Sequence, residues 1–217
     1  QDIQVRQVDL SIMSSVMAVA DSLLADGKPI ALLMNNAGTM CTHFQQTSDG
    51  LEYTVAVNYV APYLLSRKLL PLMQAGSRIV CMVSCTYAIG QITPEFFTRG
   101  KKGEFWRIPI YSNTKLARWL FVRKLALEVA SRGIWVGASD PGIVSTNIIR
   151  MDMWFDPLTD LFFRPFIRTP KQGAATAVHL LLDGLPMSET GQMYASCKQR
   201  RLKPVYLNHP QMDSLWN

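Results

Sequence analysis

A phenol and an ammonium stand four residues apart in the segment Tyr111-Ser112-Asn113-Thr114-Lys115. On a helix, this spacing places both side chains on one face, about one turn apart. A phenol with a pKa of about 10 is a poor acid or base at neutral pH. A neighbouring ammonium favours the phenolate and lowers that pKa. The pair could therefore serve as a general acid/base, although solvated helices also carry this spacing by chance.

Two other polar residues stand where ordinary packing would not require them. Ser84 directly follows an apolar run, and its hydroxyl could hold a substrate oxygen beside the phenol or simply cap the end of a strand. Asn58 lies in an otherwise apolar helical stretch, where asparagine is unfavourable. It could hold an ordered water in a proton relay or be a buried, internally bonded amide. Both alternatives stay open.

Short apolar runs alternate along the chain with amphipathic helical patterns. We expect strands over residues 5–8, 30–34, 78–83 and 134–138, and helices over residues 11–25, about 50–73 and 111–131. Strands this apolar are buried on both faces, and helices between them imply right-handed crossovers in a parallel sheet. The sequence predicts one α/β domain over residues 1–217, with a doubly wound, Rossmann-like parallel sheet.

In such sheets, ligands bind outside the carboxyl ends of the strands. The polar and glycine residues that directly follow each expected strand are therefore the first candidates for ligand contacts: Asp9, residues 35–38, Ser84 and residues 141–146. Two segments, 90–109 and 151–170, interrupt the alternation, and we expect both to lie on the substrate side. The aromatic-rich segment 151–170 is predicted to form a substrate lid, with core packing as the alternative.

Composition limits the class of protein. The chain has 217 residues, of which 48% are hydrophobic and 18% charged, as in a globular domain. Its net charge of +6 is spread along the chain, without the aromatic-interleaved basic face of a nucleic-acid binder, so we expect no nucleic-acid partner. A phosphate-bearing cofactor or a membrane surface explains the charge more simply. The four cysteines form no C-x-x-C pair, which favours neither a metal site nor a disulfide framework and fits a reducing compartment.

Together these residues resemble the short-chain dehydrogenase/reductase family. The resemblance covers nearly the whole chain and depends on the order of three motifs: N-N-A-G at residues 35–38, Y-x-x-x-K at residues 111–115 and P-G at residues 141–142. It implies that Tyr111 is the general acid/base, and that Lys115 lowers its pKa and binds the nicotinamide ribose. It also implies that Ser84 orients the reacting oxygen and that Asn58 holds a relay water.

The resemblance further implies NADP or NAD as the cofactor and no metal. The residues implied to contact the cofactor are Asp9, Leu10, Asn36, Ala37, Gly38, Tyr111, Lys115, Pro141, Gly142 and Thr146.

Within the family, the chain is most similar to retinol dehydrogenase-like members. They share a long insert between serine and tyrosine (here 27 positions), an R-T-P-x-x-G-A segment like residues 168–174, and a tail like residues 191–197 with Leu215-Trp216. This similarity implies a small lipophilic alcohol or carbonyl substrate, such as a retinoid, a steroid or a fatty aldehyde. It implies a cytoplasmic location or the cytosolic face of an intracellular membrane. A peripheral membrane contact and a homodimer stay open.

The family's T-G-x-x-x-G-x-G loop, which binds the pyrophosphate at a helix amino terminus, should precede Asp9 by several dozen residues and is not in this chain. The residue that distinguishes NAD from NADP would lie near it. In the family strand order 3-2-1-4-5, lack of these first βαβ elements leaves the strand at residues 30–34 with an open edge, which is an aggregation hazard. We therefore expect the biological protein to be longer.

Three functions were weighed. The first is an oxidoreductase that transfers a hydride between NAD(P)(H) and a lipophilic substrate. The second is a non-catalytic family member that acts as a cofactor sensor or interaction module, which the absent phosphate loop favours and the intact Ser84, Tyr111 and Lys115 oppose. The third, an epimerase or dehydratase, is placed last because such enzymes carry a larger carboxyl-terminal substrate domain.

Overall fold

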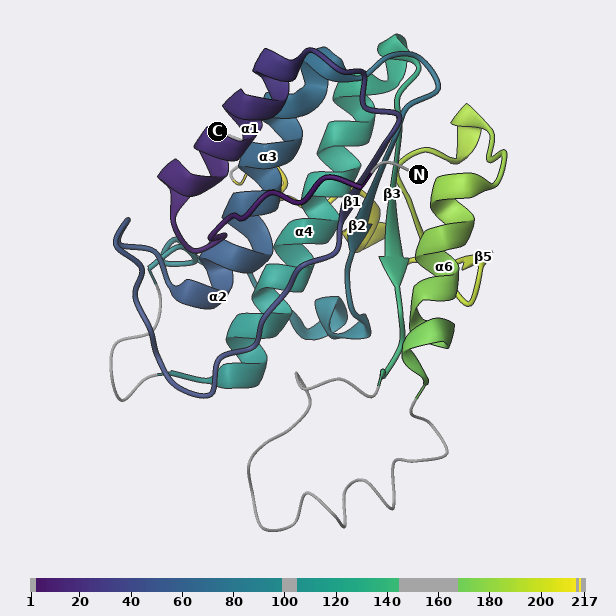
Figure 1. Ribbon diagram of the computed structural model, residues 1–217. Coiled ribbons are helices and arrows are strands. Elements are labelled where there is room, and N and C mark those ends of the chain that lie inside the picture. Colours follow the sequence, from purple (N-terminus) through teal and green to yellow (C-terminus); the bar gives the residue numbers. More distant parts are fainter. Residues whose placement is uncertain (1–2, 99–104, 145–167, 214, 216–217) are drawn as a thin grey trace.

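The computed structural model describes residues 3–98, 105–144, 168–213 and 215. Within these residues, one five-stranded sheet has the order β1-β2-β3-β4-β5 (Figure 1). The strands are β1 (Leu32–Asn35), β2 (Arg78–Met82), β3 (Trp135–Asp140), β4 (Gln192–Ala195) and β5 (Lys198–Gln199). The α-helices are α1 (Met13–Asp26), α2 (Tyr53–Val55), α3 (Ala61–Leu69), α4 (Arg107–Val129), α6 (Pro170–Leu182) and α7 (Pro204–Leu207). The shorter turns are the π-helical η1 (Ala56–Val60) and the 3₁₀-helical η2 (Leu70–Leu72), η3 (Cys85–Ile89), η4 (Ala130–Arg132) and η7 (Met187–Glu189).

The sheet is parallel except at its last strand. β1 pairs with β2, β2 with β3 and β3 with β4 in parallel, whereas β5 returns antiparallel to β4. Helices α1, α3 and α4 lie on one side of the sheet and α6 on the other (Figure 1). The predicted doubly wound, Rossmann-like α/β fold is thereby confirmed.

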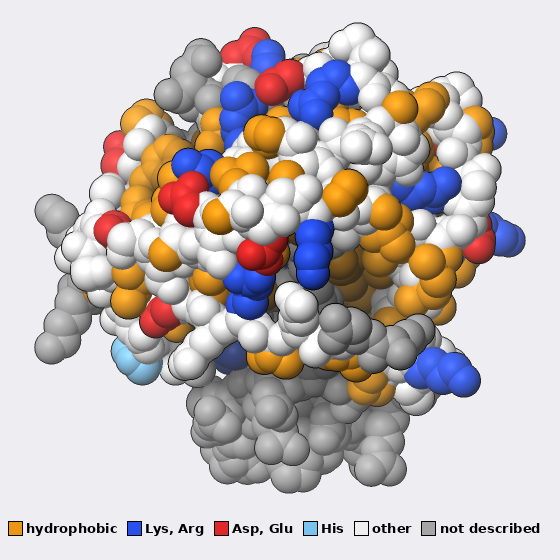
Figure 2. Space-filling model, turned by 45° about the horizontal axis from the view of Figure 1, so that its top comes forward, with side chains coloured by type: hydrophobic (Ala, Val, Ile, Leu, Met, Phe, Trp, Pro, Cys, Tyr) orange, Lys and Arg blue, Asp and Glu red, His pale blue; other side chains and the backbone are white. Residues whose placement is uncertain are grey.

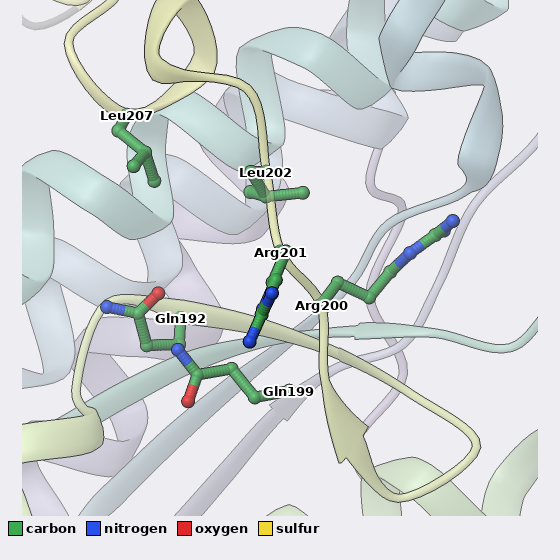
Figure 3. A pocket seen from close by; sticks show the side chains of 6 residues that line it. All are labelled: Gln192, Gln199, Arg200, Arg201, Leu202 and Leu207. Atoms are coloured by element: carbon green, nitrogen blue, oxygen red, sulfur yellow. The ribbon is translucent and has the colours of Figure 1, made fainter.

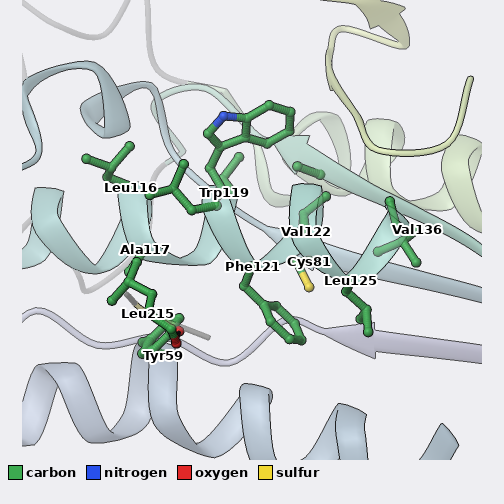
Figure 4. Packing of buried hydrophobic residues seen from close by; sticks show 14 of the residues in the cluster. Tyr59, Cys81, Leu116, Ala117, Trp119, Phe121, Val122, Leu125, Val136 and Leu215 are labelled. Atoms are coloured by element: carbon green, nitrogen blue, oxygen red, sulfur yellow. Dashed lines mark hydrogen bonds between the residues drawn. The ribbon is translucent and has the colours of Figure 1, made fainter. Parts of the chain in front are cut away.

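The side chains of the central strands alternate between two cores, as the pleat requires. Ile79 and Cys81 of β2 belong to the large core on the α4 side, whereas Val80 belongs to a smaller core on the α6 side. In the large core, Trp119 and Leu125 of α4 are fully or almost fully buried (Figure 4). This burial on both faces explains why the strands are so uniformly apolar in sequence.

The expected helix over residues 50–73 is present but interrupted. It begins at Tyr53 with the single turn α2, widens into the π-helical η1, continues as α3 and ends in the 3₁₀ turn η2. Pro62 stands at the start of α3 and has no N–H to donate to the carbonyl four residues earlier, which is that of Asn58. The irregular turn therefore coincides with the candidate residue Asn58.

The strand predicted over residues 5–8 is wrong. Residues 3–9 form no strand, and Val5 is 91% exposed. A strand needs a neighbour to accept its backbone hydrogen bonds, and no described strand runs beside this segment. Arg6 instead binds the side chains of Ser22 and Asp26 on α1.

The open edge expected at residues 30–34 is confirmed within the described residues. β1 pairs with β2 alone, and Leu32 is 43% exposed although it lies in a strand. Figure 2 shows the molecule with the top of Figure 1 turned forward. On this face hydrophobic side chains surround a hollow, and lysine, arginine and acidic side chains are interspersed over the rest of the surface.

The carboxyl-terminal elements β4, β5, α6 and α7 were not predicted. Helix α6 does carry a recognisable signal, because Thr169 and Gln172 form a reciprocal capping box ahead of its first turn. The strands give almost none, since four and two residues are too short to show a period.

The packing of β3 generates a stability prediction at Gly137. A Cβ added at Gly137 would lie 2.2 Å from the ring of Trp135, which is 2% exposed. We expect Gly137→Ala to lower the free energy of unfolding by about 1–3 kcal/mol in chemical denaturation, because the ring cannot move without disturbing its core. At Gly184 an added Cβ meets nothing within 4 Å, so Gly184→Ala is the matched control and should leave stability almost unchanged. Equal stability of the two variants would contradict this prediction.

Candidate active site

The site is built where β2 ends and α4 passes it. Ser84 caps the short η3 turn that follows β2, and η3 packs against α4. Gly90 permits this close approach, because a Cβ there would lie 2.5 Å from the carbonyl oxygen of Ser112. Helix α4 begins at Arg107, four residues before Tyr111, so the tyrosine lies in its second turn and not at its start as expected.

Ser84 and Tyr111 are brought together at this junction. Burial raises the pKa of Tyr111, while a hydrogen bond with the Ser84 side chain and the positive charge of Arg118 act in the opposite direction. The Ser84 hydroxyl oxygen also accepts from the backbone N–H and the hydroxyl of Thr86, at 3.4 and 3.3 Å. Serine and phenol are therefore placed to hold one substrate oxygen between them.

Lys115 completes the group from the next turn of α4. Its ammonium lies 5.2 Å from the centroid of the Tyr111 ring and donates to the backbone oxygen of Met82 at 3.3 Å. The side chain is 3% exposed, and this burial, followed by the nearby charge of Arg118, lowers its pKa well below the ordinary value. An ammonium has three N–H donors. The donors not directed at Met82 suit the hydroxyls of a bound ribose.

Asn58 is completely buried, and its side chain is fully bonded within the protein. Its amide oxygen accepts from the backbone N–H of Thr39 at 2.7 Å, and its amide nitrogen donates to the Thr39 carbonyl at 2.8 Å and to Thr114 Oγ1 at 3.1 Å. Its backbone oxygen accepts from Arg118 Nε at 2.7 Å. These contacts match the alternative of an internally bonded amide, which ties the loop after β1 to α4.

The predicted loop of residues 35–38 lies beside this group. Asn35 is buried and donates to Ser66 Oγ at 2.8 Å, whereas Asn36 and Ala37 are exposed. A Cβ at Gly38 would lie 3.5 Å from both Asn58 Oδ1 and Lys115 Nζ. Gly38 therefore lies directly beside both Asn58 and Lys115.

Four more of the predicted cofactor contacts are described: Asp9, Leu10, Pro141 and Gly142. Asp9 is exposed, its pKa is lowered by hydrogen bonds from the side chain and backbone of Ser11, and Leu10 follows it just before α1.

After β3, Gly142 has a φ of 72° and donates to Asp140 Oδ1 at 3.0 Å, while the Pro141 carbonyl accepts from Arg168 at 3.2 Å. Thr146 and residues 151–167 of the predicted lid lie outside the described residues.

Sequence reasoning missed two charged groups of the site. Arg118 is 1% exposed and lies three residues beyond Lys115, so a reading of the same helix face would have found it. Asp140, the last residue of β3, is 2% exposed and accepts from Arg200 Nη1 at 2.7 Å. No local sequence pattern predicts the Asp140–Arg200 pair, because its two residues are 60 positions apart.

A separate cavity of about 460 Å³ lies beside the β4–β5 hairpin. Its lining residues are Gln192, Gln199, Arg200, Arg201, Leu202 and Leu207. In Figure 3 the Arg201 side chain extends toward the two glutamines, and the Arg200 side chain extends away from them. Ser84, Tyr111 and Lys115 do not line this cavity, so it is distinct from the predicted site.

The described residues form neither a metal site nor a helix that spans a membrane. In residues 3–98, 105–144, 168–213 and 215, no group of histidine, cysteine and acidic side chains could hold a metal ion. In the same ranges, no helix is long and apolar enough to cross a bilayer.

Known proteins of one family are similar to this chain in sequence. The short chain dehydrogenase family model matches residues 1–153. Human retinol dehydrogenase 12 is 34% identical over 98% of this chain and 67% of its own length. Human retinol dehydrogenase 14 is 32% identical over 98% of this chain and 64% of its own length. The chain thus spans about two thirds of these relatives.

Solved structures share the fold. An uncharacterised protein from Mycobacterium paratuberculosis superimposes with a TM-score of 0.74 at 23% identity, covering 98% of this chain and 72% of that one. A short chain dehydrogenase from Burkholderia cenocepacia in complex with NADP has a TM-score of 0.65 at 20% identity, covering 87% of this chain and 73% of that one. The chain therefore belongs to the short-chain dehydrogenase family of NAD(P)-dependent oxidoreductases, with retinol dehydrogenases among its relatives.

Proposed function

We propose that this protein transfers a hydride between NAD(P)(H) and a small lipophilic alcohol or carbonyl compound, using Ser84, Tyr111 and Lys115. The observation that supports this most directly is the convergence of a hydroxyl, a phenol and a buried ammonium beside the loop of residues 35–38. The retinol dehydrogenases among the relatives favour a substrate of the retinoid, steroid or fatty aldehyde type.

When bound, NAD(P) supplies the hydride acceptor for oxidation and the hydride donor for reduction. In alcohol oxidation, ionised Tyr111 takes the proton from the substrate hydroxyl; in carbonyl reduction, neutral Tyr111 returns it to the new alkoxide. Ser84 donates a hydrogen bond to the same substrate oxygen and orients it. Before substrate binds, the same serine hydrogen-bonds the phenol and lowers its pKa; a serine has one hydrogen to donate, so the substrate oxygen takes the place of the phenol as its acceptor.

The cofactor contacts of the described residues are proposed in the same way. Lys115 would hold the ribose hydroxyls with its spare N–H donors, and the backbone of Asn36, Ala37 and Gly38 would lie along the cofactor. Asp9 and Leu10 would contact the adenine end. At the opposite end of the cofactor, Pro141 and Gly142 would contact the nicotinamide. Thr146, which lies outside the described residues, would contact it as well.

In this proposal the side chain of Asn58 holds the site together, and its backbone oxygen is the candidate acceptor for a relay water. Its side chain fastens Thr39 and Thr114, as described above, and its backbone oxygen already accepts one bond, from Arg118. A carbonyl oxygen has two lone pairs. A relay water at Asn58 would therefore have to share this oxygen with the guanidinium.

Three wider expectations remain proposals. The segment 151–170 would form a lid over the apolar substrate, and its outer face would contact a membrane at the periphery. The protein would act in the cytoplasm or at the cytosolic face of an intracellular membrane, and a homodimer is compatible with this. The competing function, a non-catalytic cofactor sensor, would keep the fold and the cofactor contacts but show no turnover.

Replacement of Tyr111 tests the hydride-transfer enzyme against the non-catalytic cofactor sensor. We expect Tyr111→Phe to abolish turnover of a hydrophobic alcohol with NAD(P) and to leave the Kd for the cofactor nearly unchanged, because the phenol supplies a proton and little affinity. Steady-state kinetics and calorimetric titration with NADPH would measure both. A variant that keeps more than a small fraction of the wild-type kcat would show that Tyr111 is not the acid/base.

Replacement of Ser84 should move the pH dependence. Loss of its hydrogen bond raises the pKa of Tyr111 further, so less phenolate is present at a given pH. We expect the rising limb of alcohol oxidation, and the falling limb of carbonyl reduction, to shift to higher pH in Ser84→Ala. The control Ser84→Thr retains a hydroxyl and should keep the limbs near the wild-type position. If the limbs of the pH–rate profile coincide in Ser84→Ala and the wild type, Ser84 does not influence the pKa of Tyr111.

A further inference from the structure

Arg118 stands at the centre of the site without an acidic partner. Its guanidinium donates only to backbone oxygens: Nε to Asn58 at 2.7 Å, Nη1 to Met82 at 3.0 Å and to Asn35 at 3.5 Å, and Nη2 to Ala37 at 3.1 Å. Among the described residues, no carboxylate forms an ion pair with it. A fully buried, unneutralised guanidinium is costly, so its retention calls for a reason beyond packing.

The carbonyls that Arg118 binds belong to the elements that carry the site. Asn35 and Ala37 lie in the loop along which we place the cofactor, Met82 ends β2 just before Ser84, and Asn58 lies in η1. The Asn58 carbonyl can accept this bond because its α-helical donor would be the N–H of residue 62, which is a proline. One planar donor group thus fixes three segments relative to α4.

Arg118 is also a close neighbour of the reacting groups. Arg118 Nη1 and Lys115 Nζ donate to the same oxygen, that of Met82. Burial lowers the pKa of Lys115 well below its usual range and also lowers that of Arg118, but a guanidinium starts from a much higher pKa and stays protonated in proteins. The charge of Arg118 acts on Tyr111 and lowers the pKa of the phenol.

We propose that Arg118 is a positioning residue of this site, with two effects. It fixes the carbonyl framework beneath the cofactor loop, and its charge favours the ionised form of Tyr111. The inference extends the proposed function, in which Tyr111 is the acid/base and Lys115 binds the ribose.

The direction of the charge effect does not depend on how Tyr111 and Lys115 share a proton. A fixed positive charge disfavours every proton on its neighbours, so it lowers both apparent pKa values of the coupled Tyr111–Lys115 pair. The other titratable groups that face the pair are Cys81 on β2, Cys85 on η3 and Asp140 at the end of β3. These groups are unchanged in the variants below.

The test is a titration of Tyr111 by ultraviolet difference absorbance in the cofactor-free protein, where Tyr111→Phe serves as the blank in each background. We expect Arg118→Gln to raise the midpoint of Tyr111 ionisation by about one pH unit, because loss of the Arg118 charge removes one of the influences that lower the pKa of the phenol, and a nearby opposite charge typically shifts a pKa by about 1–3 units. Arg118→Lys should keep the midpoint near wild type. It should nevertheless raise the Kd for NADPH and lower kcat by about tenfold, because a single ammonium cannot hold the separated carbonyls.

Arg123→Gln is the matched control. Arg123 lies on the same helix and also donates to backbone oxygens, to that of Gly191 at 2.9 Å and to that of Leu207 at 3.4 Å. We expect its loss to lower Tm and to leave the Tyr111 midpoint in place. An unmoved midpoint in Arg118→Gln, with a loss of Tm like that of the control, would overturn the charge effect.

Arg118→Lys keeps the proposal testable if Arg118→Gln fails to fold. Wild-type cofactor binding and kcat in Arg118→Lys would show that any buried cation suffices and would overturn the positioning role. The titration needs no turnover, so its outcome is independent of the proposed reaction. Failure of the proposed function would appear separately, as absence of NAD(P)-linked turnover in the wild-type protein.

Discussion

The burial of two basic side chains against one carbonyl oxygen constrains the whole site. Lys115 and Arg118 both donate to Met82 O, and both are almost completely excluded from water. Desolvation of a charged group costs several kcal/mol, and like charges add to that cost. Each hydrogen bond from a charged donor contributes about 1.5–3 kcal/mol to stability. The buried guanidinium therefore needs most of its carbonyl partners to offset its desolvation.

That requirement links the local irregularities of the fold. Carbonyls inside regular strands and helices already accept one backbone hydrogen bond, so they are less available to a buried arginine than the carbonyls at the ends of these elements. The structure supplies acceptors at the carboxyl ends of β1 and β2 and at the π-helical turn before Pro62. The break in the helix between α2 and α3 is thus part of the site.

Much of this arrangement could be predicted from sequence, and the limits have physical reasons. Buried parallel strands leave short continuous apolar runs, and the helices between them are long, so β1, β2, β3, α1 and α4 were expected close to where they lie. Residues 5–8, with the sequence Val-Arg-Gln-Val, were also expected to form a strand but do not, because pairing requires a neighbouring strand that a local pattern cannot report.

Within the site, the expected residues were those with a motif. Tyr111 and Lys115 share a helical spacing, and Ser84 follows a strand. Arg118 escaped notice because an arginine on a helix is ordinarily solvated. The structure shows that Arg118 is buried on the face of α4 that it shares with Lys115, and that Asn58 is bonded to Thr39 and Arg118.

The contacts of Arg118 also bear on the loop of residues 35–38. Arg118 of α4 binds the Ala37 carbonyl, and Asn58 of η1 binds the backbone of Thr39, so both side chains restrain this loop. The precision with which this loop can meet a cofactor therefore depends on the same buried guanidinium that influences the ionisation of Tyr111.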